Sequence, residues 1–254
     1  MLRERAAQGA TVRLELVVDV HESGTTDDII ATLPGRSSDE LVIVNTHTDG
    51  TSASEENGAI GVLALAQYLS SLPDECRART FVFVLTPGHF YHGLDDTKRF
   101  IERHPELIAK AVGSLTIEHL GQMEWHDDET GFHSTGLPEI GSLYGSDTPV
   151  QAIGKNAVIA EDLRRTRVSL PLAGGGYFGV GSALNQAGVP NLAYLTAPHS
   201  MLAWGERTGD NEYTQNVDKT DRDRMHQEIR TFTRIATSMD GSPPDVLCEG
   251  MCRE

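Results

Sequence analysis

The sequence predicts an α/β layer fold whose inner strands run parallel. Short and nearly uninterrupted apolar runs, such as LVIVN at 41–45, alternate with segments that carry apolar residues at helical spacing. Strands that are apolar on both faces are typical of sheets covered by helices on both sides. Histidine or carboxylate residues follow three of these runs, and ligands of such sheets bind beyond the carboxyl ends of the strands. We therefore expect a site at that edge.

The first half of the chain is expected to begin with strands. Residues 11–20 (TVRLELVVDV) alternate polar and apolar side chains, as a half-buried strand does, and 28–33 is its expected hairpin partner. Beyond this pair we expect inner strands at 41–45, 80–85 and 115–120, and helices at 57–72, 95–103 and 105–112.

The second half is less regular. Residues 122–147 are polar, glycine-rich and aromatic, which indicates a long surface or active-site insertion. After it we expect helices at 148–163, 180–187 and 217–239, and strands at 168–170 and 191–196. The expected division is a single domain over residues 1–240, followed by a tail at 241–254.

Composition narrows the class of protein. The 254 residues are 39% hydrophobic and 23% charged, which is enough for one substantial core. The 21 Lys and Arg against 37 Asp and Glu give an acidic chain of net charge −16, which phosphate groups would repel. We therefore expect neither nucleic acid nor an anionic membrane as a partner.

Two further features bear on the compartment. The first residues lack the apolar segment of a secretory signal, so the default expectation is the cytoplasm. The chain has three cysteines, and Cys248 and Cys252 are interpreted as tail cysteines of no function, with half a metal site or a strained disulfide as alternatives.

Five polar residues mark the predicted strand ends. Because the carboxyl ends of parallel strands meet at one edge, these residues define one candidate site. A His-x-Asp pair is also common among surface polar residues, and a histidine in a loop is more often a satisfied polar group than a ligand. The five are His47, Asp49, His89, Glu118 and His119.

Glu55 and Glu56 precede the expected helix at 57–72. In one interpretation Ser54 caps this helix and the acidic residues complement its dipole. In the other, one carboxylate turns towards His47 and binds or bridges metal ions. The residues alone leave both interpretations open.

Glu118 interrupts an apolar strand, and a buried charge without compensation is costly. A metal or a cationic partner would relieve that cost. Neighbouring strand residues point to opposite faces, so Glu118 and His119 cannot both bind a metal unless the strand has already ended. His199, in the loop after the last expected strand, is a further candidate. Imidazole and carboxylate ligands suit zinc first, with manganese, iron or cobalt as alternatives.

Four segments resemble the aminopeptidase Y family of two-zinc exopeptidases, whose relatives include leucyl aminopeptidases and glutaminyl cyclases. They are LVIVNTHTDG, EENGAIGVLALAQYLSSL, RTFVFVLTPGHFYHG and TIEHLG, within residues 26–121. The resemblance implies a three-layer α/β/α sandwich around a mixed, largely parallel central sheet, which has eight strands in the family. It also implies two zinc ions and a small peptide or amide substrate.

When the roles of the family's residues are carried over position by position, the resemblance implies that His47 is a metal ligand and that Asp49 is the carboxylate that orients it. Glu56, or less readily Glu55, would replace the bridging aspartate, and Glu118 would replace the aspartate in the fourth strand as a metal ligand.

The chain also departs from the family. The family has a Glu-Glu pair where this chain has Gly88-His89, so His89 would become a ligand and the general base would be missing unless Glu55 supplies it. His199 is a loose counterpart of the late histidine ligand, and we assign His119 to substrate binding.

Three functional hypotheses follow. The first is a divergent metal-dependent amide or peptide hydrolase, aminopeptidase-like, in which metal-bound water attacks a carbonyl and Glu55 or Glu56 handles the proton. The second is a catalytically inactive homologue that serves as a binding or structural module. The third is a metal enzyme with altered chemistry, such as cyclisation or lyase action on a small amide.

Overall fold

The computed structural model describes most of the chain, as residues 2–11, 13, 15–19, 23–50, 53–88, 96–128, 131–169, 179–196, 219–248 and 251. The elements up to the middle of the chain are α1 (Leu2–Ala7), β1 (Ile29–Leu33), β2 (Ser37–His47), α2 (Ala53–Glu56), α3 (Gly58–Ser71), a 3₁₀ turn (Asp74–Cys76), β3 (Arg79–Thr86), α4 (Asp96–Arg103), α5 (Pro105–Ile108) and β4 (Ala111–Ile117). The later elements are β5 (Met123–Asp128), β6 (Gly131–Pro138), β7 (Gly141–Gly145), α6 (Val150–Ala160), β8 (Thr166–Ser169), α7 (Gly181–Gln186), β9 (Asn191–Thr196), α9 (Arg222–Gly241) and α10 (Pro244–Cys248).

The central sheet has seven strands among the described residues, in the order β1-β3-β2-β4-β9-β7-β8. Strands β3, β2, β4 and β9 run parallel, whereas β1 joins β3 and β7 joins β9 in antiparallel pairs. The expected mixed and largely parallel sheet is confirmed. In the parallel part, β2, β3, β4 and β9 all end at the same edge.

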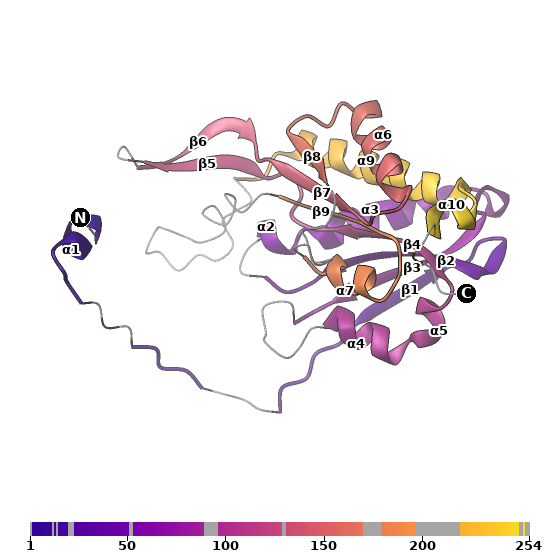
Figure 1. Ribbon diagram of the computed structural model, residues 1–254, viewed down its shortest axis with the longest axis horizontal. Helices are drawn as coiled ribbons and strands as arrows, with labels where there is room; N and C mark the ends of the chain where they lie inside the picture. The colour runs from indigo at the N-terminus through magenta and orange to yellow at the C-terminus, as the bar shows by residue number, and fades with distance from the viewer. Residues whose placement is uncertain are drawn as a thin grey trace.

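Helices cover both faces of this sheet and complete the three layers (Figure 1). The side chains of β2 alternate between the two cores, because successive strand residues point to opposite faces. Val42 and Val44 pack with residues of α3, α6, α9 and α10, whereas Leu41 and Ile43 pack with residues of α4 and α7. The same alternation explains the nearly unbroken apolar runs of the inner strands.

The expected strand at 11–20 is wrong. Its described residues form no strand, and Leu16 and Val17 are exposed. Strand β1 finds its antiparallel partner in β3 instead, so the hairpin is not formed. An alternating pattern fits a half-buried strand but does not supply the neighbour that a strand needs.

Two boundaries near the site also differ from expectation. The helix expected at 105–112 ends at Ile108, and β4 begins at Ala111 and ends at Ile117 rather than Leu120. Glu118 and His119 therefore follow the strand instead of belonging to it, which matters for the site.

The expected insertion at 122–147 contains a hairpin, β5–β6, that projects from the layers, and then β7, a strand of the central sheet (Figure 1). In the expected tail, α10 packs on the core through the buried Leu247. Cys248 is disulfide-bonded, so its interpretation as a cysteine of no function is wrong. Cys76 is free and exposed.

No helix among the described residues combines the length and apolar character that a membrane crossing requires.

Candidate metal centre

Three buried side chains meet beyond the carboxyl ends of β2 and β4. They are His47, Glu55 and His119, and each offers one ligand atom within 4.8 Å of the others. His47 is the last residue of β2, Glu55 lies on the four-residue helix α2, and His119 lies two residues after β4. The parallel pairing of β2 with β4 brings the two histidines to the same sheet edge.

The protonation of His47 is set by its hydrogen bond. Its Nδ1 lies 2.7 Å from the backbone oxygen of Asp49. A carbonyl oxygen only accepts, so Nδ1 carries the proton and donates it. In the neutral ring the lone pair is then on Nε2, which lies 4.0 Å from Oε1 of Glu55 and 3.5 Å from Oε2 of Glu118. This is the tautomer and orientation that a histidine ligand of a metal adopts.

Glu55 is turned inward by the short helix α2, and only 1% of its surface is exposed, whereas its neighbour Glu56 is exposed. Its Oε1 lies 3.2 Å from Nε2 of His119, within hydrogen-bond reach. Gly50 leaves room for the stem of the Glu55 side chain, since a Cβ at this position would lie 2.3 Å from Cγ of Glu55.

Glu118 lies beside this group because β4 has already ended. His119 has a positive φ of 55°, so the chain turns there and both side chains reach the site rather than opposite faces of a sheet. Oε1 of Glu118 accepts a hydrogen bond of 3.0 Å from the backbone N–H of Val180. Gly179 lies against the same oxygen, with a φ of 89° and no space for a Cβ.

Burial raises the pKa of Glu118 to about 7. The charge of His119 and the N–H of Val180 favour the ionised carboxylate and so lower the pKa of Glu118. The nearby Glu55 raises this pKa further. A carboxyl with this pKa exchanges its proton near neutral pH, which is the property expected of a proton-handling group.

Asn57 fixes the distance between the two halves of the site. Its Nδ2 donates to the carbonyl of Leu120 at 2.8 Å, and its Oδ1 accepts from the N–H of Leu120 at 2.7 Å. This pair of bonds ties the start of α3, next to Glu55, to the turn that carries His119. The sequence analysis assigns no role to Asn57, and the signal available is its place at the start of the expected helix, where the structure has it as the N-cap of α3.

The structure brings together four of the residues expected at the site, namely His47, Glu55, Glu118 and His119. The backbone of Asp49, rather than its carboxylate, orients His47, since its Oδ1 lies 3.9 Å from Nδ1 of His47. Glu56 is exposed, and Glu55 takes the place that the resemblance gave to Glu56 first. His89 and His199 lie outside the described residues.

The donor set fits a metal ion. Two imidazole nitrogens and a carboxylate are hard to borderline ligands, and zinc binds all of them. Three protein ligands also leave the open position that catalytic zinc sites keep. His47 Nε2, a Glu55 oxygen and a His119 nitrogen would hold the ion, and Glu118 would lie next to it.

Comparison with known proteins gives structural matches alone. No family model matches the sequence, and no curated protein matches it. A solved aminopeptidase from Aneurinibacillus sp. strain AM-1 matches with a TM-score of 0.57 and 16% identity, over 85% of this chain and 48% of that one. A zinc aminopeptidase from Bacillus subtilis matches with a TM-score of 0.59 and 13% identity, over 88% and 53%.

A glutaminyl cyclase from an Acidobacteriales bacterium matches with a TM-score of 0.58 and 13% identity, over 84% of this chain and 73% of that one. The chain thus spans about half the length of the aminopeptidases it matches. At these identities the likeness shows the fold: the chain has the three-layer fold shared by zinc aminopeptidases and glutaminyl cyclases.

Proposed function

We propose that this protein is a zinc-dependent amide hydrolase of aminopeptidase type, with its metal held by His47, Glu55 and His119. The observation that carries the proposal is the convergence of these three buried side chains within 4.8 Å, with His47 oriented through its Nδ1. The shared fold with zinc aminopeptidases supports it.

A bound zinc ion supplies a Lewis acid for the substrate carbonyl and lowers the pKa of water. Glu118 is suited to hold or transfer a proton at Oε2, while Val180 fixes its Oε1. Because a nearby cation favours the ionised carboxylate, Glu118 then acts as the proton acceptor. In this proposal Glu55 is a ligand rather than the base, and the exposed Glu56 has no part in the chemistry.

The described donors suffice for one ion. The expected second ion depends on His89 and His199, outside the described residues, and it stays a prediction. Zinc is the first choice, and manganese, iron or cobalt compete for the same ligands. The proposed substrate is a small peptide or amide.

Elemental analysis combined with a substrate screen tests this proposal. The protein is purified without chelator, its metal content is measured, and hydrolysis of a panel of aminoacyl anilides is followed before and after treatment with EDTA. Bound zinc with turnover that EDTA abolishes and added zinc restores supports the hydrolase. Zinc without turnover contradicts the hydrolase, and protein that takes up no zinc and hydrolyses none of the substrates supports the catalytically inactive module instead.

Cyclisation is a second candidate, because the fold also matches that of a glutaminyl cyclase, with a TM-score of 0.58 over 84% of this chain. In this reaction the amino group of an N-terminal glutamine attacks its own side-chain amide, and ammonia leaves. Incubation with a glutaminyl peptide and mass spectrometry of the product separates the candidates, since cyclisation removes ammonia from an intact peptide and hydrolysis shortens the peptide.

A further inference from the structure

We propose that Glu228, on the long helix α9, is a positioning residue of the metal centre. It acts through the turn that carries His119 rather than by contact with the metal. The inference rests on the proposed zinc site and adds to it a residue from the second half of the chain, far in sequence from the ligands.

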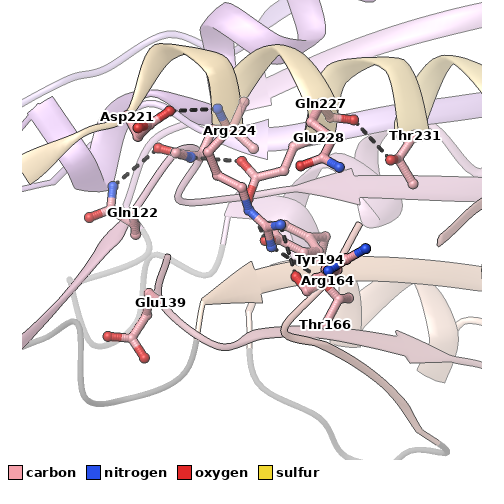
Figure 2. A network of polar contacts seen from close by, with 12 residues as sticks. Gln122, Glu139, Arg164, Thr166, Tyr194, Asp221, Arg224, Gln227, Glu228 and Thr231 are labelled. Carbon is pink, nitrogen blue, oxygen red and sulfur yellow. Dashed lines mark hydrogen bonds and ion pairs between the residues drawn. The ribbon is translucent and has the colours of Figure 1, made fainter. Parts of the chain in front are cut away.

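The carboxylate of Glu228 is buried and accepts three hydrogen bonds. Its Oε1 accepts from Oη of Tyr194 at 2.6 Å and from Nε of Arg224 at 2.9 Å, and its Oε2 accepts from the backbone N–H of Gly121 at 2.7 Å. Only 1% of its surface is exposed. Figure 2 shows Glu228 on α9 with Arg224 and Tyr194 beside it.

Arg224, one of the donors to Glu228, is itself held by residues of the loop before β8 and of β8. The guanidinium of Arg224 donates to the backbone oxygen of Arg164 at 2.9 Å and to Oγ1 of Thr166 at 3.2 Å (Figure 2). Arg224 therefore holds the Glu228 carboxylate in one orientation, and its second oxygen is directed at Gly121. Tyr194 is an additional donor to the oxygen that Arg224 already binds.

The turn after β4 is held from two sides. His119 and Gly121 both have positive φ, of 55° and 69°. Asn57 holds Leu120 between them from the side of α3. From the side of α9, Glu228 accepts the N–H of Gly121, and Asp221 donates its own N–H to the carbonyl of Gly121 at 2.7 Å.

Glu228 thus holds one flank of the turn, and His119 lies two residues from the point of attachment. Partners that orient metal ligands from outside typically change metal affinity by about 10–100-fold when they are removed. We expect a loss of this size at position 228.

Glu228→Gln tests the proposal without changing the size of the side chain. A carboxylate accepts at both oxygens, whereas an amide has one oxygen and one NH₂. Whichever way the amide is turned, its NH₂ faces a donor, either the Gly121 N–H or the Arg224 and Tyr194 pair. Tyr194→Phe is the matched control, because it removes a bond to Glu228 and leaves the one to Gly121.

Zinc affinity is measured for the full chain by competition with a chromophoric chelator. We expect Glu228→Gln to bind zinc at least about tenfold more weakly than the wild type, and Tyr194→Phe to stay within about threefold. Amide hydrogen exchange at Gly121 should accelerate in Glu228→Gln alone. If Glu228→Gln does not fold, Glu228→Asp, which keeps the charge but cannot span the same distance, takes its place with the same expected direction.

The outcomes separate the two proposals. Wild-type protein that binds no zinc contradicts the proposed function. Wild-type protein that binds zinc, together with a variant at position 228 of equal affinity, overturns the role of Glu228 and leaves the proposed function standing. Equal losses in the variant at position 228 and in Tyr194→Phe show a general effect of the network on stability, and they also overturn the proposal.

Discussion

Nε2 of His119 lies 3.2 Å from Oε1 of Glu55, although 64 positions separate the two residues. The contact joins the turn after β4 to the short helix α2, and His47 completes the group from the end of β2. Two segments that leave parallel strands at the same edge thereby supply imidazole and carboxylate to one buried point. Metal binding and stability should both depend on how this contact is supported.

His47→Ala should abolish tight zinc binding. His47 is one of three proposed ligands, so its loss should weaken zinc binding by more than the roughly 10–100-fold that removal of outer partners causes. Chelator competition on purified protein measures the affinity. His126→Ala is the control, because His126 is exposed on the β5–β6 hairpin. Unchanged affinity in His47→Ala, or equal losses in both variants, would contradict the assignment.

Glu118→Gln should change how stability depends on pH in the metal-free protein. The pKa of Glu118 is about 7 in the folded chain, against an ordinary value of 4.5. Between these pH values the folded protein holds a proton that the unfolded chain has released. The contribution of Glu118 to the free energy of unfolding therefore falls as pH rises, by about 1.4 kcal/mol per pH unit and on the order of 3 kcal/mol in all.

The variant lacks this fall, so it should gain stability relative to the wild type as pH rises from 4.5 to about 7. Urea denaturation of both proteins in the presence of a chelator, at several pH values across this range, measures the difference. Parallel pH profiles would show that Glu118 does not titrate in this window.

The inner strands of the fold can be predicted from the sequence because their burial on both faces requires runs of apolar residues. Strands β2, β3 and β9 are covered on both faces, so apolar residues dominate them, and their ends are marked by polar side chains. That is why the sequence alone assigns His47 to the strand edge.

Other elements depend on partners that no local pattern reveals. Strand β7, with the sequence GSLYG, is predicted as part of an insertion because glycines flank it. Gly141 is required there by its neighbour, since a Cβ would lie 2.5 Å from Oη of Tyr194. The choice between Glu55 and Glu56 also depends on structure that no local pattern reveals, because the short helix α2 buries Glu55 and exposes Glu56.

Asn57→Ala should destabilise the protein by about 1–3 kcal/mol, because it leaves the N–H of Leu120 buried without its side-chain partner, whereas the carbonyl of Leu120 keeps the bond of 3.2 Å from Nε2 of Gln122. Unsatisfied buried groups of this kind cost about 1–3 kcal/mol each. Urea denaturation gives the value. Ser70→Ala, which removes an exposed hydroxyl from the end of α3, should cost less than about 0.5 kcal/mol. A loss at Asn57 as small as that at Ser70 would show that the turn holds its position without this residue.

Gly179→Ala should cost more stability than Gly136→Ala, although both glycines have positive φ, of 89° and 74°. A Cβ at Gly136 meets nothing within 4 Å, so that variant bears only the unfavourable backbone conformation, about 1–2 kcal/mol. A Cβ at Gly179 would lie 2.2 Å from Oε1 of Glu118, so the carboxylate must also move and lose its bond to Val180. We expect a total of about 3 kcal/mol.

The displaced carboxylate gives this comparison a second measurement. Because Oε2 of Glu118 lies 3.5 Å from Nε2 of His47, a shift of Glu118 changes the surroundings of the proposed metal ion. Gly179→Ala should therefore weaken zinc binding, and Gly136→Ala should leave it unchanged. The two variants could instead lose equal stability and keep unaltered zinc affinity. That result would mean that the chain around Gly179 relaxes without moving Glu118. The close approach of Gly179 to Glu118 would then have no part in shaping the site.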